Sequence, residues 1–225
     1  MHGLPDIDDA LAAQWLAELP ADYQQRLSRL RIRRRLVQSL IGLQLLKKLA
    51  AERDVRGFRL DRIRTTTLGK PHADDLADFS ISHDEELVAC ALTDHDRVGL
   101  DVECVREINI GHFARVFSTD EFAWIDNDSA RFFALWTRKE AAVKVSGEHG
   151  IGHLQAVTIE DTRTELDARP LYLQPLDLAP GYAACVAADA PITDVCVRRV
   201  VWGTEGDHAL ELLPTDQVRV FRNAP

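Results

Sequence analysis

A long segment of spaced leucines, residues 22–52, places the strongest constraint on how this chain folds. The leucines recur at steps of three to four residues or longer, which suits one face of an amphipathic helix. The members of this stripe are Leu27, Leu30, Leu36, Leu40, Leu43 and Leu46. We therefore expect one long helix here, or two consecutive helices, with the leucines packed in a core.

The remaining segments indicate strands grouped between helices. Further helices are predicted at 8–19, 111–125 and 129–147. Strands are predicted at 79–82, 87–93, 97–103, 155–161, 170–176, 181–188 and 194–202. Polar residues at 84–86 and 94–96 suit hairpin turns between the first three strands. The order helix, strands, helices, strands predicts an α+β fold rather than an alternating βαβ sheet.

The leucine-rich segment is also the most basic part of an acidic chain. The net charge is −9, yet no acidic residue lies between Tyr23 and Ala51. The cations of this stretch are Arg26, Arg29, Arg31, Arg33, Arg34, Arg35, Lys47 and Lys48. A solvated helix face would give such a run, but the absence of acids favours a local anionic partner. Phosphate groups, an acidic protein and nucleic acid are the candidates.

Composition bounds the class of protein. Hydrophobic residues make up 46% of the chain and charged residues 28%, which is ordinary for a globular protein. No run approaches the roughly 20 apolar residues that span a bilayer, so we expect no membrane association. The first residues are acidic and carry no basic region, which predicts no secretory signal. The four cysteines are scattered without a CxxC pair, as in a reducing cytoplasm. We therefore expect a cytoplasmic protein.

Two carboxylates stand near the end of a predicted strand. Asp101 and Glu103 are two residues apart in Gly-Leu-Asp-Val-Glu (99–103), so both side chains face the same way. Like charges that close repel each other unless a cation lies between them. Mg²⁺ suits that place because it binds carboxylate and phosphate oxygens. The pair indicates a magnesium site, although two exposed acids on one strand face would give the same pattern.

A predicted helix carries a second group of candidate residues. Trp136, Glu140 and Lys144 lie on one helical stripe at a spacing of four. Trp136 is expected in the core. Glu140 and Lys144 form either a surface ion pair or, beside a metal, a general base and a phosphate clamp.

Two shorter motifs precede these residues. Ser82-His83 ends a predicted strand, where the hydroxyl, the imidazole and a backbone N–H could hold a phosphate. Gly69-Lys70-Pro71 is by itself a turn with a lysine. It is not a GxxxxGK[ST] phosphate-binding loop, because the upstream glycine is missing.

Together, in this order and spacing, the motifs resemble those of the 4'-phosphopantetheinyl transferases. The resemblance is to the longer, pseudo-dimeric type that serves polyketide, nonribosomal peptide and sometimes fatty-acid synthases. That family shows a GKP turn, a serine-histidine strand end, a G-[IL]-D-[IV]-E strand and a W-x-x-K-E-A-x-x-K helix. This chain has the corresponding segments at 69–71, 82–83, 99–103 and 136–144, and the resemblance covers roughly residues 25–190.

The resemblance implies a fold and an activity. The fold would be α+β with two similar halves, each a small antiparallel sheet packed on a helix, and an active site in the cleft between them. We expect the halves at 1–103 and 104–225, in a monomer. The activity would be Mg²⁺-dependent transfer of 4'-phosphopantetheine from coenzyme A to a serine of an apo acyl or peptidyl carrier protein. Adenosine 3',5'-bisphosphate would be released.

The resemblance also implies roles for particular residues. The metal ligands would be Asp101, Glu103 and Glu140, and Glu140 would also be the general base. The residues expected to contact coenzyme A are Lys70 and Pro71 on the adenine side, Ser82 and His83 at the phosphates, and Lys144 with Lys139 at the pyrophosphate.

One position departs from the family pattern. The family usually has an arginine in the long N-terminal helix that meets the ribose 3'-phosphate, and Gln38 occupies that position here. Arg34 and Arg35 lie about one turn upstream and are expected to substitute for it.

Three other functions would use the same features. A magnesium-dependent nuclease or phosphatase would use Asp101, Glu103 and Glu140, but it leaves the motifs at 69–71 and 82–83 unexplained. An inactive carrier-binding paralogue fits the changed arginine position, yet the three carboxylates and Lys144 are all present. A nucleic-acid binder would use the basic segment; we expect no DNA binding at physiological salt.

Overall fold

In a computed structural model, the leucine-rich segment forms two consecutive helices, α2 (Ala21–Ser28) and α3 (Arg33–Glu52), after α1 (Asp9–Ala17). Leu27, Leu40, Leu43 and Leu46 are buried, as the stripe predicted. The structure describes residues 4–94, 96–147, 151–202, 210–212 and 219–222. In these ranges no helix is long and apolar enough to cross a membrane. The chain divides into two compact units, residues 1–190 and 191–225.

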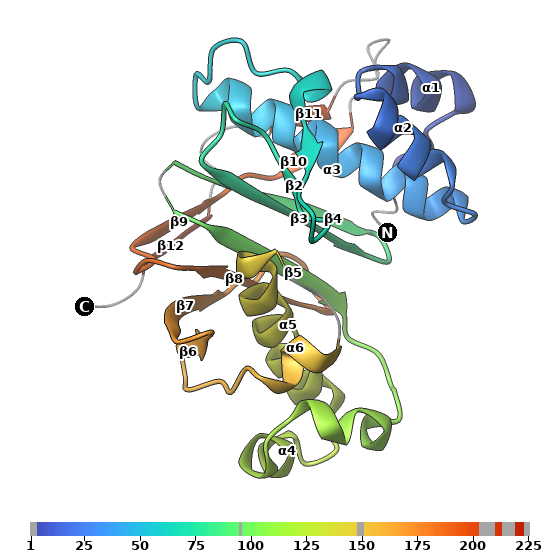
Figure 1. Ribbon diagram of the computed structural model, residues 1–225. Coiled ribbons are helices and arrows are strands. Elements are labelled where there is room, and N and C mark those ends of the chain that lie inside the picture. The colour runs from blue at the N-terminus through green and yellow to red at the C-terminus, as the bar shows by residue number, and fades with distance from the viewer. Residues whose placement is uncertain (1–3, 95, 148–150, 203–209, 213–218, 223–225) are drawn as a thin grey trace. The chain divides into compact units, whose positions relative to one another are not determined.

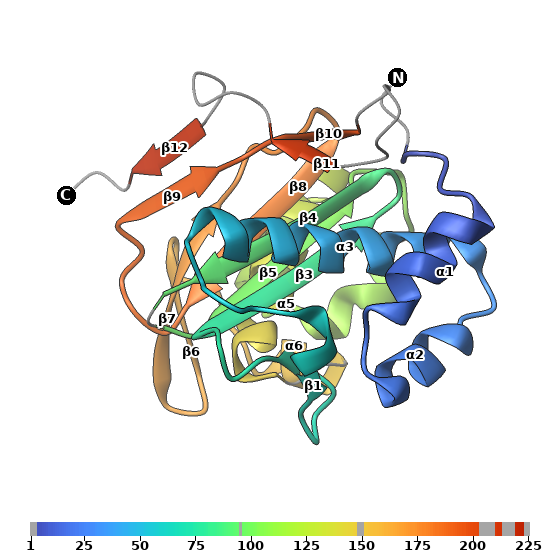
Figure 2. The same ribbon diagram turned by 90° about the horizontal axis from the view of Figure 1, so that it is seen from above.

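Residues 1–190 contain two main antiparallel sheets, each with its own helix (Figures 1 and 2). Strands β3 (Asp78–Asp84) and β4 (Leu87–Thr93) form a hairpin that packs against α3. The second sheet has the order β5-β8-β7-β6 and packs against α5 (Ser129–Ser146). Its strands are β5 (Val98–Cys104), β6 (Arg163–Leu166), β7 (Arg169–Pro175) and β8 (Tyr182–Ala188).

Shorter elements connect these layers. They are η1 (Leu60–Arg62), β1 (Arg64–Thr65), β2 (Pro71–His72), η2 (Ile110–Val116), α4 (Thr119–Ile125) and α6 (Ile151–Gln155). In residues 191–225, β9 (Asp194–Val197) pairs with β12 (Arg219–Arg222), and β10 (Val200–Trp202) pairs with β11 (Leu210–Leu212). The mixture of helices and small antiparallel sheets confirms the α+β class. The division into similar halves at residue 103 stays a prediction.

The predicted strand at 155–161 is wrong. The segment begins as the end of α6 and continues without regular structure to an isolated bridge at Glu160. Its backbone is satisfied by side chains instead of by a strand: Glu121 accepts from the N–H of Ile159, and Lys139 donates to the carbonyl of Val157. Strand β6 was not predicted, because it is only four residues long and only Thr164 and Leu166 of it are buried.

Two other predicted elements are each divided. The helix predicted at 111–125 is split between η2 and α4, because Ser118 and Glu121 form a capping box that starts α4 afresh. The strand predicted at 194–202 is divided into β9 and β10. The remaining predicted helices and strands lie within one or two residues of their expected bounds.

Gly99 marks the closest approach of β5 to α5. A Cβ atom at this position would lie 2.0 Å from the Ala141 carbonyl oxygen and 2.8 Å from the backbone nitrogen of Val145. Neither backbone atom can yield without moving the helix. The glycine before the two carboxylates therefore lets α5 pack directly against β5, which brings residues 140 and 144 to the same place as residues 101 and 103.

We expect Gly99→Ala to lower the free energy of unfolding by about 3 kcal/mol, because the added methyl overpacks a helix–strand contact. Urea denaturation followed by circular dichroism measures the change. Gly152→Ala is the control, since a Cβ at Gly152 meets no atom within 4 Å, and its effect should be under about 1 kcal/mol. Equal stability of wild type and Gly99→Ala would contradict the close approach.

Candidate functional site

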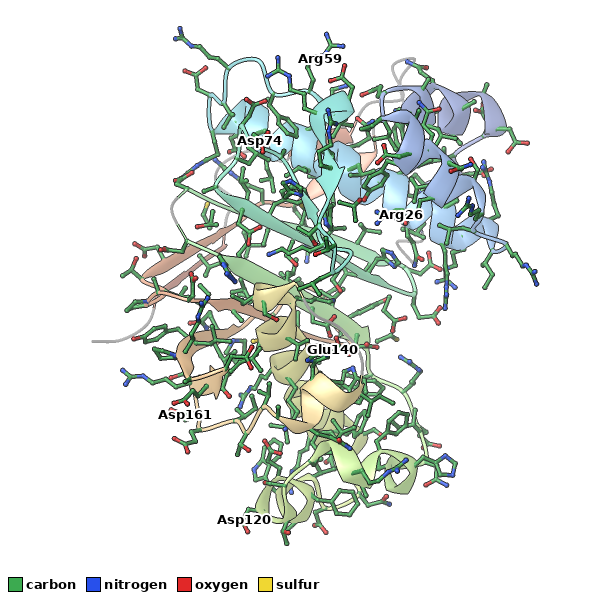
Figure 3. All side chains as sticks on the ribbon, in the orientation of Figure 1. Arg26, Arg59, Asp74, Asp120, Glu140 and Asp161 are labelled. Atoms are coloured by element: carbon green, nitrogen blue, oxygen red, sulfur yellow. The ribbon has the colours of Figure 1, made fainter. Side chains whose placement is uncertain are left out.

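Three of the four sequence motifs contribute to one pocket, which is lined by residues of β3, β5 and α5. Figure 1 shows these three elements as neighbours. The cavity has a volume of about 270 Å³. Its lining residues are Ile81, Ser82, His83 and Asp84 of β3, Asp101, Val102 and Glu103 of β5, and Glu140 and Lys144 of α5. Figure 3 labels Glu140 on α5. Three segments that are remote in sequence therefore contribute to one polar cavity.

Asp101 is the most deeply buried carboxylate of the pocket, with 3% of its surface exposed. Its Oδ1 accepts from the Ser82 hydroxyl at 3.0 Å and from Lys144 Nζ at 2.6 Å. Its Oδ2 is buried and has no hydrogen-bond partner among the described residues. Burial raises the pKa of Asp101, and Lys144 and Ser82 oppose that shift. A buried oxygen without a donor is where a bound cation would fit.

Glu103 lies beside Asp101 on the same face of β5, as the alternation of the strand predicted. Its pKa is raised to about 8, first by burial and then by the charges of Asp101 and Asp84. Arg106, with a nitrogen 3.7 Å from the Glu103 carboxylate, opposes that shift. A carboxyl with a pKa of about 8 is mainly protonated at pH 7, and a neighbouring cation would favour its ionised form.

Glu140 and Lys144 both line the pocket, as their spacing on one helical stripe predicted. Helix α5 is fixed at its start by Asp128, whose side chain accepts from the N–H of Arg131, and at its end by the left-handed Gly147. Lys144 Nζ forms an ion pair with Asp101 Oδ1 on β5, at 2.6 Å. Its Nζ also lies 3.1 Å from Ser82 Oγ. Lys144 therefore joins the helix to both strands.

His83 is half-buried and lines the same pocket. Burial lowers the pKa of its imidazole, and the positive charges of Lys144 and Arg35 lower it further. The ring is therefore mainly neutral at pH 7, where one nitrogen donates and the other accepts. Arg35 itself is exposed on α3 and forms no ion pair with the described residues.

Lys139 does not join the pocket, which corrects the prediction that it neutralises the pyrophosphate. Its side chain is 1% exposed, and its Nζ forms a 2.9 Å ion pair with Glu121 and donates to the Val157 carbonyl. The ring of Phe117 lies 5.6 Å from the same nitrogen. Lys139 and Glu140 are adjacent on α5 and so point in different directions, one into the core and one into the pocket.

Lys70 and Pro71 also lie outside the pocket wall. Lys70 Nζ contacts Asp78 at 2.5 Å and the Val98 carbonyl at 2.9 Å, and its side chain is 13% exposed. Pro71 lies in β2 opposite Thr65. The ammonium group thus joins β3 to β5, and its contact with the adenine side of coenzyme A stays a prediction.

The basic helix separates into paired and unpaired arginines. Arg34 lies 2.7 Å from both Glu85 and Glu86, at the turn of the β3–β4 hairpin. Gln38 is buried and donates to the Glu85 carbonyl at 2.8 Å, so it serves the same turn. Arg35 is the neighbouring cation that carries no such partner among the described residues, and its charge acts on His83 in the pocket.

The donor set fits a hard divalent cation. Among the described residues, no three His, Cys, Asp or Glu side chains are close enough to form a metal site by themselves. Mg²⁺, however, commonly takes one or two carboxylates and completes its coordination with water and substrate phosphate. Asp101 offers an unpartnered oxygen, and Glu103 is a carboxylate whose ionisation a nearby cation would favour.

Sequence reasoning missed Asp84 and Arg106. Asp84 was interpreted as part of a polar turn, but it lines the pocket at the end of β3. Arg106 follows β5 and lies 2.9 Å from Asp84 Oδ2. The available signal was the alternation of polar residues at 78, 80, 82 and 84 within one strand.

Comparison with known proteins gives a consistent result. Residues 97–186 match the model of the 4'-phosphopantetheinyl transferase superfamily. The 4'-phosphopantetheinyl transferase gsp of Aneurinibacillus migulanus is 28% identical over 61% of this chain and 62% of that protein. The 4'-phosphopantetheinyl transferase Sfp of Bacillus subtilis is 29% identical over 60% of this chain and 68% of its own length. The 4'-phosphopantetheinyl transferase AcpT of Escherichia coli is 34% identical over 45% and 54%.

The matched region contains β5, α5 and most of β8, and five of the nine residues that line the pocket. The chain aligns with less than two thirds of the first of these relatives. These matches agree with the family expected from the motifs: the chain is similar to 4'-phosphopantetheinyl transferases, and the family model matches residues 97–186.

Proposed function

We propose that this protein transfers the 4'-phosphopantetheine group of coenzyme A to a serine of an apo carrier protein. The supporting observation is the convergence of Asp101, Glu103, Glu140 and Lys144 on one pocket inside the region that matches the family. The serine oxygen would form a bond to the β-phosphorus of coenzyme A. The bond from that phosphorus to adenosine 3',5'-bisphosphate would break, and the serine proton would pass to the enzyme.

The pocket residues suit that reaction. Glu140 is the general base that we assign to the serine hydroxyl, directly or through water. Lys144 places a positive charge where the pyrophosphate would lie, next to the buried Asp101. Of Asp101, Glu103 and Glu140, one or two carboxylates at a time would hold Mg²⁺ together with water and substrate phosphate. When bound there, the ion would offset negative charge that develops on the phosphoryl oxygens and the leaving group. His83 would donate a hydrogen bond to a phosphate oxygen, and Ser82 would do so by turning its single hydroxyl proton away from Asp101.

The surface of α2 and α3 supports an anionic partner. Arg33, Arg34 and Lys47 are each paired with carboxylates. In contrast, Arg29, Arg31 and Arg35 are exposed and form no ion pair with the described residues. Uncompensated cations on a chain of net charge −9 favour a phosphate group or an acidic protein at this surface.

We expect Arg35→Ala to raise the Michaelis constant for coenzyme A or for the carrier about tenfold, because one charge-assisted contact in binding is lost. The turnover number should change less than about threefold, because the lost contact is made equally in the bound substrate and in the transition state. Arg34→Ala should have a smaller effect because Glu85 and Glu86 already hold that guanidinium. Steady-state kinetics with each substrate varied in turn measures both constants. A larger effect at Arg34 than at Arg35 would contradict this assignment.

The test of the function is intact-mass spectrometry of apo carrier proteins from fatty-acid, polyketide and peptide synthases after incubation with this protein, coenzyme A and Mg²⁺. A gain of one phosphopantetheine group supports the proposal, and a chelator should stop the gain reversibly. No gain with any carrier would reject it and favour a magnesium-dependent phosphatase or an inactive carrier-binding paralogue. The two halves at 1–103 and 104–225, the monomeric state and a cytoplasmic location are further parts of the proposal.

A further inference from the structure

A row of side-chain hydrogen bonds joins β3 to β5. The two strands belong to different sheets, yet alternate side chains of β3 accept from backbone N–H groups of β5. The pairs are Val98 N with Asp78 Oδ2 at 2.9 Å, Leu100 N with Ser80 Oγ at 3.0 Å, Val102 N with Ser82 Oγ at 3.2 Å and Cys104 N with Asp84 Oδ2 at 2.9 Å. We call these four contacts the side-chain ladder.

The ladder takes the place of a neighbouring strand at this edge of β5. The other edge of β5 pairs with β8 through ordinary backbone hydrogen bonds. Buried backbone N–H groups require acceptors, and here short side chains supply them at every second residue. The residue numbers rise together in all four pairs, so the ladder fixes the register of β5 against β3. That register sets Asp101 and Glu103 against Ser82 and His83 in the pocket.

Asp84 makes the last contact of the ladder and has two donors on one oxygen. Its Oδ2 accepts from the Cys104 N–H and from Arg106, each at 2.9 Å. The same nitrogen of Arg106 donates to the Cys104 carbonyl at 2.8 Å and lies 3.7 Å from the Glu103 carboxylate. Asp84 thereby holds both the backbone that follows Glu103 and the cation beside the Glu103 side chain.

We propose that Asp84 is a positioning residue for the cation-binding carboxylates, which holds the end of β5 so that Glu103 stays beside Asp101 at the pocket. The inference rests on the proposed function only through the bound cation. Ser80 and Ser82 hold the middle of β5 with neutral hydroxyl groups, so the essential property of residue 84 is its hydrogen-bond acceptor. A charge that itself paired with the cation would have a different requirement, which separates the two roles.

The experiment compares Asp84→Ala with Asp84→Ser in the full-length protein. Serine restores the short acceptor used at positions 80 and 82, whereas alanine removes it. Binding of Mn²⁺ is measured by electron paramagnetic resonance, with and without coenzyme A. We expect Asp84→Ala to weaken Mn²⁺ binding at least about tenfold, as removal of an outer-shell partner of a metal ligand does. Asp84→Ser should stay within about threefold of wild type.

Amide hydrogen exchange provides a second reading of the same variants. The Cys104 N–H should exchange faster in Asp84→Ala and keep most of its protection in Asp84→Ser, while the amides of Leu100 and Val102 stay protected in both. Ser80→Ala is the matched control, because Ser80 belongs to the ladder but not to the pocket wall. It should expose the Leu100 amide to exchange and leave Mn²⁺ affinity within about threefold.

The following outcomes would overturn the proposal. An equal loss of Mn²⁺ affinity in both Asp84 variants would mean that the charge itself acts on the cation. Wild-type Mn²⁺ affinity in both variants would mean that Asp84 does not position the cation-binding carboxylates. If the wild-type protein bound no Mn²⁺, there would be no cation site for Asp84 to support. If Asp84→Ala does not fold, a tenfold loss in Asp84→Ser with a protected Cys104 amide is enough to overturn it. A wild type that binds Mn²⁺ and shows these effects, but modifies no carrier, would reject only the transfer.

Discussion

Asp101→Ala and Glu140→Ala are each expected to lower the rate of carrier modification about a thousandfold or more, while the protein stays folded. Losses of this size are seen when a general base, or a group that stabilises transition-state charge, is removed from an enzyme. The physical reasons differ between the two residues. Asp101 Oδ2 is buried and has no donor among the described residues, while its Oδ1 accepts from Lys144 at 2.6 Å. Glu140 lines the pocket and, in the proposed reaction, would accept the proton of the serine hydroxyl.

Time courses of intact carrier mass measure these rates, and circular dichroism reports whether each variant is folded. Glu165→Ala is a suitable control, because Glu165 is an exposed carboxylate on β6 outside the pocket. Its rate should stay within about twofold of wild type, as for surface substitutions away from a site. Near-normal transfer by Asp101→Ala or Glu140→Ala would mean that the corresponding cation or base assignment is wrong.

Lys139→Ala is expected to lower the free energy of unfolding by about 3–5 kcal/mol, because it leaves a buried carboxylate without its counter-ion. The carboxylate is that of Glu121, which is 7% exposed and caps the start of α4. The same change also frees the Val157 carbonyl, where Lys139 now donates. Lys139 therefore stabilises the connection between α4, α5 and the segment before β6.

Urea denaturation measures this loss, and the fraction that remains folded should keep its Michaelis constant for coenzyme A. Lys47→Ala is the matched control, since Lys47 forms an exposed ion pair with Glu18 that is worth less than about 1 kcal/mol. A stable Lys139→Ala variant with weakened coenzyme A binding would restore the original interpretation of Lys139 as a phosphate contact.

The local features of the pocket follow directly from residue spacing. Alternation along a strand predicts that Asp101 and Glu103 face one side, and a spacing of four on a helix predicts that Glu140 and Lys144 do so. Both pairs line the cavity. The α+β class likewise follows from the order of helical and strand-like patterns, because periodicity is a property of consecutive residues.

Only the tertiary structure decided which neighbour each of these faces meets. Lys139 and Lys144 lie on one helix and carry the same charge, yet one pairs with Glu121 in the core and the other with Asp101 in the pocket. Asp84 is of a residue type that is common in turns, yet its side chain accepts a hydrogen bond from the backbone N–H of Cys104, 20 residues away on β5. Spacing fixes the side of an element on which a residue lies, whereas packing between distant segments fixes the atoms that it finds there.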